Sequence, residues 1–74
     1  MRPLAWNPEF PQILATGSWD GSVIVWDVYK QVPLYKYQFN SDIYGLDFSS
    51  QRPFELAVTS RDLTIQILFL RDLS

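Results

Sequence analysis

Residues 15–27 read Ala-Thr-Gly-Ser-Trp-Asp-Gly-Ser-Val-Ile-Val-Trp-Asp, and a looser copy of this stretch occupies residues 57–69. The two copies align without a gap at an offset of 42 residues, which places Asp62 on Asp20. The alignment continues toward the N-terminus of each copy and pairs Leu4 with Leu46, Trp6 with Phe48, Pro11 with Pro53 and Leu14 with Leu56. An internal repeat of this period indicates a protein assembled from successive copies of one supersecondary unit.

The composition is typical of a folded protein. Of the 74 residues, 47% are hydrophobic and 19% are charged, a balance that argues against disorder. The net charge is −2 and the Lys and Arg residues are scattered, so nothing suggests the basic patch of a nucleic-acid-binding protein. No apolar run comes near the length of a membrane span, about 18 residues, and no segment resembles a secretion signal. The default expectation is therefore a cytoplasmic protein, with a nuclear location left open.

The chain contains no cysteine and no histidine. This excludes disulfides, thiol nucleophiles, Cys/His metal sites and the usual general base near neutral pH. Asp20 and Asp62 occupy the same position in two repeat copies, so each is expected at its own turn rather than in a catalytic carboxylate pair. The sequence therefore predicts no enzymatic activity, no cofactor and no metal site.

Turn signals divide the chain into short β-strands, with no helical stripe of useful length. The two prolines within residues 7–11 remove backbone donors and end a first strand. Asp20-Gly21 predicts a two-residue hairpin turn, because this pair suits positive backbone angles. The return strand at residues 23–26 is apolar on both faces, which predicts that it is covered from both sides. The expected strands are residues 2–6, 13–18, 22–27, 34–39, 43–48, 54–60 and 64–70.

The stretches Ser-Trp-Asp-Gly at residues 18–21 and Val-Trp-Asp at residues 25–27 resemble the WD-repeat family of β-propellers. The resemblance implies an all-β fold made of propeller blades. Residues 1–39 would form one complete four-stranded antiparallel blade, and residues 40–74 a degenerate repeat with three strands of the next blade. On this interpretation the chain is a fragment of a larger propeller.

The resemblance also implies a network of side chains that ties each blade together. In the family this network joins a strand Ser or Thr, the hairpin Asp, a strand Trp and a loop His. Thr16, Asp20 and Trp26 occupy the first three positions here, and the histidine is absent from the chain. A tryptophan donates a single hydrogen bond, which a threonine hydroxyl can accept. The second repeat keeps only Asp62, so packing is expected to hold that blade together.

The function implied by the resemblance is that of a non-enzymatic scaffold for protein–protein contacts, whose partner proteins the sequence does not identify. Family geometry places the hairpin turns and the start of each first strand on the face where partners dock. The candidate contact residues on that face are Trp19, Asp42, Tyr44 and Arg61. An exposed tryptophan makes a good anchor, although its ring could instead cover a neighbouring turn.

Two other interpretations are open from the sequence. The aromatic content of 16% would also suit a free-standing small β-barrel that binds extended peptides, although such a barrel does not need an internal repeat. The chain could also be a truncated gene product without an independent function. For a fragment, bare blade faces and sheet edges predict that the isolated chain self-associates or requires the remaining blades.

Overall fold

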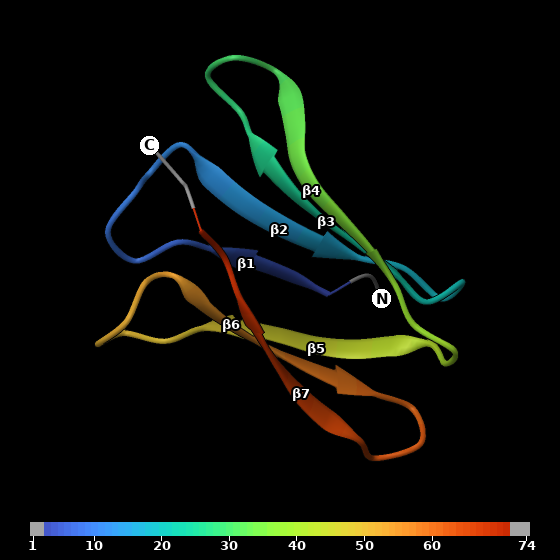
Figure 1. Ribbon diagram of the computed structural model, residues 1–74. Helices are drawn as coiled ribbons and strands as arrows, with labels where there is room; N and C mark the ends of the chain where they lie inside the picture. Colours follow the sequence, from blue (N-terminus) through green and yellow to red (C-terminus); the bar gives the residue numbers. More distant parts are fainter. Residues whose placement is uncertain (1–2, 72–74) are drawn as a thin grey trace.

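Seven β-strands in two antiparallel sheets make up the part of the chain that the computed structural model describes, residues 3–71 (Figure 1). The first sheet contains, in spatial order, β1 (Leu4–Trp6), β2 (Ile13–Gly17), β3 (Ser22–Asp27) and β4 (Val32–Gln38). The second sheet contains β5 (Ile43–Phe48), β6 (Glu55–Ser60) and β7 (Ile65–Phe69). Within each sheet every strand pairs with the next one along the chain. The prediction of an all-β fold with a four-stranded and a three-stranded antiparallel sheet is confirmed.

Several strand ends differ from the predicted positions. β2 ends at Gly17, because the backbone of Ser18 belongs to the hairpin turn that follows. β4 begins at Val32 rather than at residue 34, and it continues through Pro33. An edge strand tolerates a proline, because the missing N–H is not needed for pairing. β6 and β7 each lose a residue at their predicted starts, and residue 2 of the predicted first strand lies outside the described residues.

The two sheets stack face to face around one hydrophobic core. The first sheet contributes completely buried side chains from β2 and β3, namely Ile13, Ala15, Val23 and Val25. The second sheet contributes Ile43, Phe48, Leu56 and Val58, and the core also includes Leu70. Burial of each larger aliphatic side chain contributes roughly 1.5–3 kcal/mol. The stacked faces, rather than any local turn, therefore supply most of the stabilisation that the fold requires.

β3 is covered from one side only, whereas its sequence predicts cover on both sides. Val23 and Val25 point into the core, and Ile24 and Trp26 belong to the opposite face and are half-buried. That opposite face surrounds an open hollow of about 690 Å³, which Leu14 also lines. Residues 3–71 contain only the two sheets, so no third sheet covers this hollow within the described chain.

The hairpin between β2 and β3 is not the predicted two-residue turn. The amide of Gly21 donates to the carbonyl of Ser18 at 3.1 Å, and the amide of Ser18 donates to the carbonyl of Ser22 at 3.0 Å. Of the turn residues only Gly21 has a positive φ, 88°, so Asp20 does not adopt the left-handed conformation that a two-residue turn requires. The turn is a longer one, in which the single glycine carries the strained position.

The hairpin between β6 and β7 repeats this geometry with a leucine in place of the glycine. The amide of Leu63 donates to the carbonyl of Ser60 at 3.0 Å, and the amide of Ser60 donates to the carbonyl of Thr64 at 3.0 Å. Leu63 has a φ of 65° and is 84% exposed. A leucine in the left-handed region is strained, and this one gains almost no burial in return.

Replacement of Leu63 by glycine should therefore stabilise the protein. The expected gain in the free energy of unfolding is about 1 kcal/mol, because glycine adopts positive φ without steric cost. Urea denaturation at fixed protein concentration measures this gain. Leu63→Ala is the matched control, because it removes the exposed side chain and keeps the Cβ atom that causes the strain. An equal gain in both variants would show that the side chain, and not the backbone conformation, is responsible.

The structure also rules out the alternative of a small closed β-barrel. A barrel needs continuous hydrogen-bonded pairing around the sheet. In the described part of the chain no strand pairing joins the first sheet to the second, and β4 and β5 belong to different sheets although they are consecutive in sequence. The molecule is a stack of two open sheets, as Figure 1 shows.

Candidate protein-interaction face

Three connections lie at the same end of the two sheets, on the right of Figure 1. They are the β2–β3 turn at residues 18–21, the β4–β5 connection at residues 39–42 and the β6–β7 turn at residues 60–63. We call the surface formed by these segments and by the start of β5 the turn face. It brings together segments that are up to about 40 residues apart in the sequence.

Backbone hydrogen bonds join the three segments of the turn face. The amide of Phe39 donates to the carbonyl of Gly21 at 2.9 Å, the amide of Ile43 to that of Ser18 at 3.2 Å, and the amide of Arg61 to that of Asp42 at 2.8 Å. Each bond fixes one turn against the β4–β5 connection. Buried or shared backbone groups of this kind hold a surface rigid without help from a ligand.

All four contact residues predicted from the sequence lie on the turn face. Trp19 is 64% exposed, so its ring leaves most of its surface free instead of covering a neighbouring turn. Arg61 and Asp42 form an ion pair with 3.7 Å between Nη1 and Oδ2, in addition to their backbone hydrogen bond. The structure thus joins two of the four residues directly and places Trp19 and Tyr44 on the adjoining segments.

A β-bulge presents Tyr44. Ile43 pairs with Ser60 and Gly45 pairs with Thr59, so Tyr44 is an extra residue in β5 without a direct partner in β6. An unpaired bulge residue is turned away from the regular alternation of the strand. Tyr44 is accordingly 59% exposed, although the residue before it is fully buried. Sequence alternation alone did not indicate this bulge.

The two hairpin aspartates act within their own turns. The carboxylate of Asp20 accepts hydrogen bonds from the Ser22 hydroxyl at 2.7 Å and from the Ser22 amide at 2.9 Å. The carboxylate of Asp62 accepts from the Ser60 hydroxyl at 2.5 Å and from the Thr64 amide at 3.1 Å. These hydrogen bonds lower the pKa of Asp20 and of Asp62 below their ordinary values. Both groups are therefore charged acceptors at neutral pH.

The side-chain network implied by the resemblance is divided in this structure. Nε1 of Trp26 donates to Oγ1 of Thr16 at 2.9 Å, across the open face of the first sheet. Asp20 is bonded to Ser22 instead, as described above. The equivalents of Thr16 and Trp26 in the second sheet are Val58 and Leu68, which pack into the core between the sheets. The role of these residues as a blade network stays a prediction.

A polar hollow of about 340 Å³ lies beside the turn face. Residues 38–41 line one side of it, and residues 60–66 contribute Ser60, Asp62, Thr64 and Gln66 to the other. The side-chain amide of Gln38 is not free to bind a ligand there, because it donates to the backbone carbonyls of Asp20 and Phe39 at 2.8 and 3.2 Å. Within residues 3–71 no cluster of three or more His, Cys, Asp or Glu side chains is placed to hold a metal ion.

Asn7, at the opposite end of the sheets, has a structural role that the sequence analysis did not identify. Its Oδ1 accepts hydrogen bonds from the amides of Glu9 and Phe10, both at 2.9 Å. Its Nδ2 donates to the carbonyl of Pro53 in the second repeat at 2.8 Å, and the side chain is buried. Beside this bond the rings of Phe10 and Phe54 lie 5.7 Å apart. Asn7 therefore links the two sheets at the end far from the turn face.

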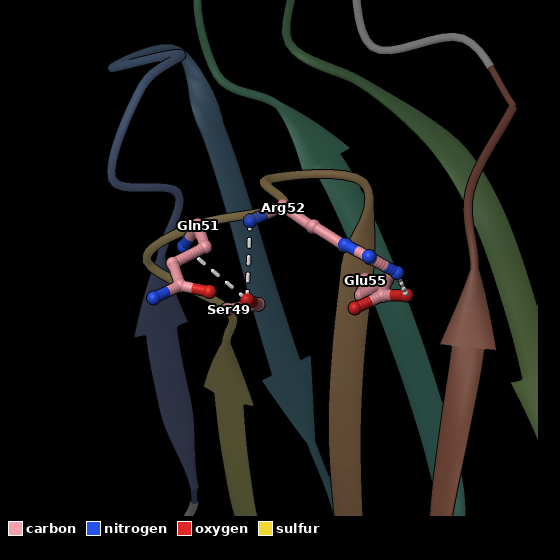
Figure 2. A network of polar contacts seen from close by, with 4 residues as sticks. All are labelled: Ser49, Gln51, Arg52 and Glu55. Carbon is pink, nitrogen blue, oxygen red and sulfur yellow. Dashed lines mark hydrogen bonds and ion pairs between the residues drawn. The ribbon is translucent and has the colours of Figure 1, made fainter.

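The second repeat has an equivalent turn at Ser49, the residue that aligns with Asn7 at the offset of 42. Figure 2 shows that Oγ of Ser49 accepts hydrogen bonds from the amides of Gln51 and Arg52, at 3.3 and 3.1 Å. Arg52 also forms an ion pair with Glu55 at 3.5 Å. The shared offset was the signal in the sequence that could have identified both capping residues.

Comparisons with known proteins agree with the geometry. The sequence model of the family described as "WD domain, G-beta repeat" matches residues 4–27, which cover β1, β2 and β3. The chain is also 37% identical over 75 aligned residues to histone acetyltransferase type B subunit 2 of Schizosaccharomyces pombe. That alignment covers 86% of this chain and 17% of the relative, so the chain spans about a sixth of the relative's length.

The described residues contain no helix that is long and apolar enough to cross a membrane. The family match falls on the copy of the repeat that carries both Trp19-Asp20 and Trp26-Asp27, and the second copy repeats the same order of strands and hairpin turn at an offset of 42 residues. The chain belongs to the WD-repeat family.

Proposed function

We propose that this chain acts as part of a non-enzymatic scaffold that binds a partner protein through the turn face. The observation that carries the proposal is the position of Trp19, Tyr44 and Arg61 on segments that backbone hydrogen bonds hold together. Tryptophan, tyrosine and arginine are the residues most enriched among those that dominate binding energy at protein interfaces.

The rigidity of the turn face favours this function. A protein that orders its surface loops on binding loses free energy of association, roughly 0.5–1.5 kcal/mol for each immobilised side chain. Here the three turns are already fixed by main-chain hydrogen bonds, and the bulge already presents Tyr44. The exposed Arg61–Asp42 ion pair adds little stability by itself, but it positions the guanidinium group beside the aromatic side chains.

The comparisons supply the context for the proposal. WD-repeat proteins generally work as platforms for protein–protein contacts, and the Schizosaccharomyces pombe relative is named as a subunit of a larger enzyme. We infer that this chain likewise serves in a protein assembly, without a catalytic role of its own. A cytoplasmic or nuclear location is compatible with this role.

A closer resemblance within the family is part of the same proposal. The phrases Gly-Ser-Trp-Asp at residues 17–20, Asp-Ile-Tyr-Gly-Leu at residues 42–46 and Ser-Arg-Asp at residues 60–62 resemble adjoining repeats of WD repeat-containing protein 17. All three phrases lie on or beside the turn face. We therefore place the residues that would distinguish this protein from other family members on the surface that we propose for docking.

The test combines cross-linking with affinity measurements. A photoreactive amino acid placed at Trp19 should cross-link a protein partner, whereas the same group at Tyr29, which is exposed on the β3–β4 turn, should not. The partner identified in this way is then purified. Replacement of Trp19, Tyr44 and Arg61 by alanine should raise its Kd at least tenfold, because a contact residue of this type contributes about 1–2 kcal/mol or more.

Two controls accompany this measurement. Tyr29→Ala removes an aromatic side chain at a distance from the turn face and should leave the Kd unchanged. The urea midpoint of the triple variant should equal that of the wild type within error, because the three side chains are largely exposed. Equal Kd values for the triple variant and the wild type would contradict the proposed role of the turn face.

A further inference from the structure

The 42-residue offset assigns equivalent faces to the two sheets. The front face of the first sheet carries Ala15, Val23 and Val25, and cross-strand pairing shows that these residues share one side. Their equivalents on the second sheet are Ala57, Ile65 and Ile67, which also share one side. The other side of each sheet is the back face. It carries Leu4, Trp6, Leu14 and Trp26 in the first sheet and Leu46, Phe48, Leu56 and Leu68 in the second.

The core between the sheets forms where unlike faces meet. Ala15, Val23 and Val25 of the first front face are completely buried, and so is Leu56 of the second back face. The contact is therefore heterologous, with the front of one repeat on the back of the next. A heterologous contact leaves one unpaired face of each kind at the two ends of the stack.

Both unpaired faces are apolar and exposed. On the second front face Ile65 is 67% exposed, and Ile67 and Phe69 are also exposed. On the first back face Leu4 is 57% exposed, Trp6 is exposed, and the open hollow described above lies against Trp26. Each face is equivalent by the offset to a face that is buried inside the same molecule.

We propose that the second front face binds the first back face of another copy of this chain, in the same front-to-back geometry as the internal core. The internal core serves as the template, because it already packs this pair of faces. Ile65 and Ile67 would take the places of Val23 and Val25, and the hollow beside Trp26 and Leu14 accommodates their additional methyl groups. The second copy in turn exposes its own front face, so the chains assemble head to tail.

Charged residues limit the extent of this interface. Asp47 and Glu55 lie on the second front face where the first front face has Ala5 and Ile13. Their carboxylates stay at the edge of the contact, and Glu55 keeps its ion pair with Arg52. The apolar contact is thus concentrated on β6 and β7, over Ala57 and the exposed residues Ile65, Ile67 and Phe69.

The experiment measures the mass of the chain in solution by sedimentation. The front variant carries Ile65→Lys and Phe69→Lys, and the back variant carries Leu4→Lys and Trp6→Lys. All four side chains are exposed, so both variants should fold, which circular dichroism checks. The wild type should exceed the mass of a dimer as its concentration rises. Each variant alone should stay at the monomer mass, because each has lost one of the two unlike faces.

The mixture of the two variants is the decisive sample. The front variant keeps an intact back face and the back variant keeps an intact front face, so an equimolar mixture should reach twice the monomer mass and no more. A mixture that stays monomeric overturns the proposal, and so does a wild type that stays monomeric. Self-association of the back variant alone also overturns it, because that result indicates front-to-front contact or pairing of strand edges.

Two controls separate this assembly from other effects. Tyr29→Lys adds a charge at an exposed aromatic residue outside both faces and should assemble like the wild type. The alanine triple variant of the turn face should also assemble like the wild type, which distinguishes this proposal from the docking function. Serine replacements at the same four positions take the place of lysine in any variant that lacks a native spectrum, and they carry the same expectations for the mixture.

Discussion

Replacement of Gly21 by alanine is expected to lower the free energy of unfolding by about 3 kcal/mol. Gly21 has a φ of 88°, which alanine adopts only with strain. A Cβ atom at this position would also lie 2.3 Å from the carbonyl oxygen of Phe39 and 3.0 Å from that of Ser41. Both oxygens belong to the backbone, so no side-chain rotation relieves the contact. The β4–β5 connection has to move, and the hydrogen bond from Phe39 to Gly21 is lost.

Gly45→Ala is the matched control for this prediction. Gly45 lies in β5 without a positive φ, and an added Cβ atom would meet Thr59 at the ordinary contact distance of 3.6 Å. Its effect on the free energy of unfolding should stay within about 1 kcal/mol. Urea denaturation of both variants, at one protein concentration, gives the comparison. Similar losses in the two variants would mean that the close approach of the β4–β5 connection to Gly21 does not limit stability.

Replacement of Asn7 by alanine should also destabilise the protein by about 3 kcal/mol. The buried side chain makes hydrogen bonds to Glu9, Phe10 and Pro53, and alanine removes all of them. The carbonyl of Pro53 and the two amides then lack their partners. A buried polar group without a hydrogen bond costs roughly 1–3 kcal/mol. The loss is large because one side chain organises the β1–β2 loop and also connects it to the second sheet.

Two variants divide this effect into its parts. Ser49→Ala removes the equivalent cap in the second repeat, where the Oγ atom makes no bond to the other sheet, and should cost about 1 kcal/mol. Asn7→Asp keeps an acceptor for Glu9 and Phe10 but cannot donate to Pro53 when it is ionised. Its loss should lie between those of Ser49→Ala and Asn7→Ala. Equal losses for Asn7→Ala and Ser49→Ala would show that the bond to Pro53 contributes nothing measurable.

The repeat offset accounts for how much of the fold the sequence predicted. Asn7 and Ile13 form a backbone hydrogen bond of 3.0 Å, and their equivalents Ser49 and Glu55 form one of the same length. Such turns depend on local sequence and on the alternation of the strands, and both repeat at a fixed spacing. The number, order and pairing of the strands therefore followed from the pattern. The positions of the candidate contact residues on one end of the sheets followed from the same pattern.

The failures of prediction have local physical causes. Asp20-Gly21 is compatible with more than one hairpin, and the bonds of Ser18 and Gly21 select the longer turn. The bulge at Tyr44 is a property of the pairing between β5 and β6 and has no signature in the alternation of β5 alone. The bond from Asn7 to Pro53 spans 46 residues, which no local pattern can reveal.

The sequence by itself determined that this chain consists of two unequal WD-type repeats of short antiparallel strands, because strand periodicity and turn chemistry are encoded locally. It did not determine which side of those strands is covered, since residues 23–26 are apolar on both faces. Only the tertiary structure decided that the front of the first sheet packs on the back of the second, leaving Trp26 beside an open hollow and Ile65 exposed. Burial depends on which surfaces meet in space, and that is a property of the packed sheets together.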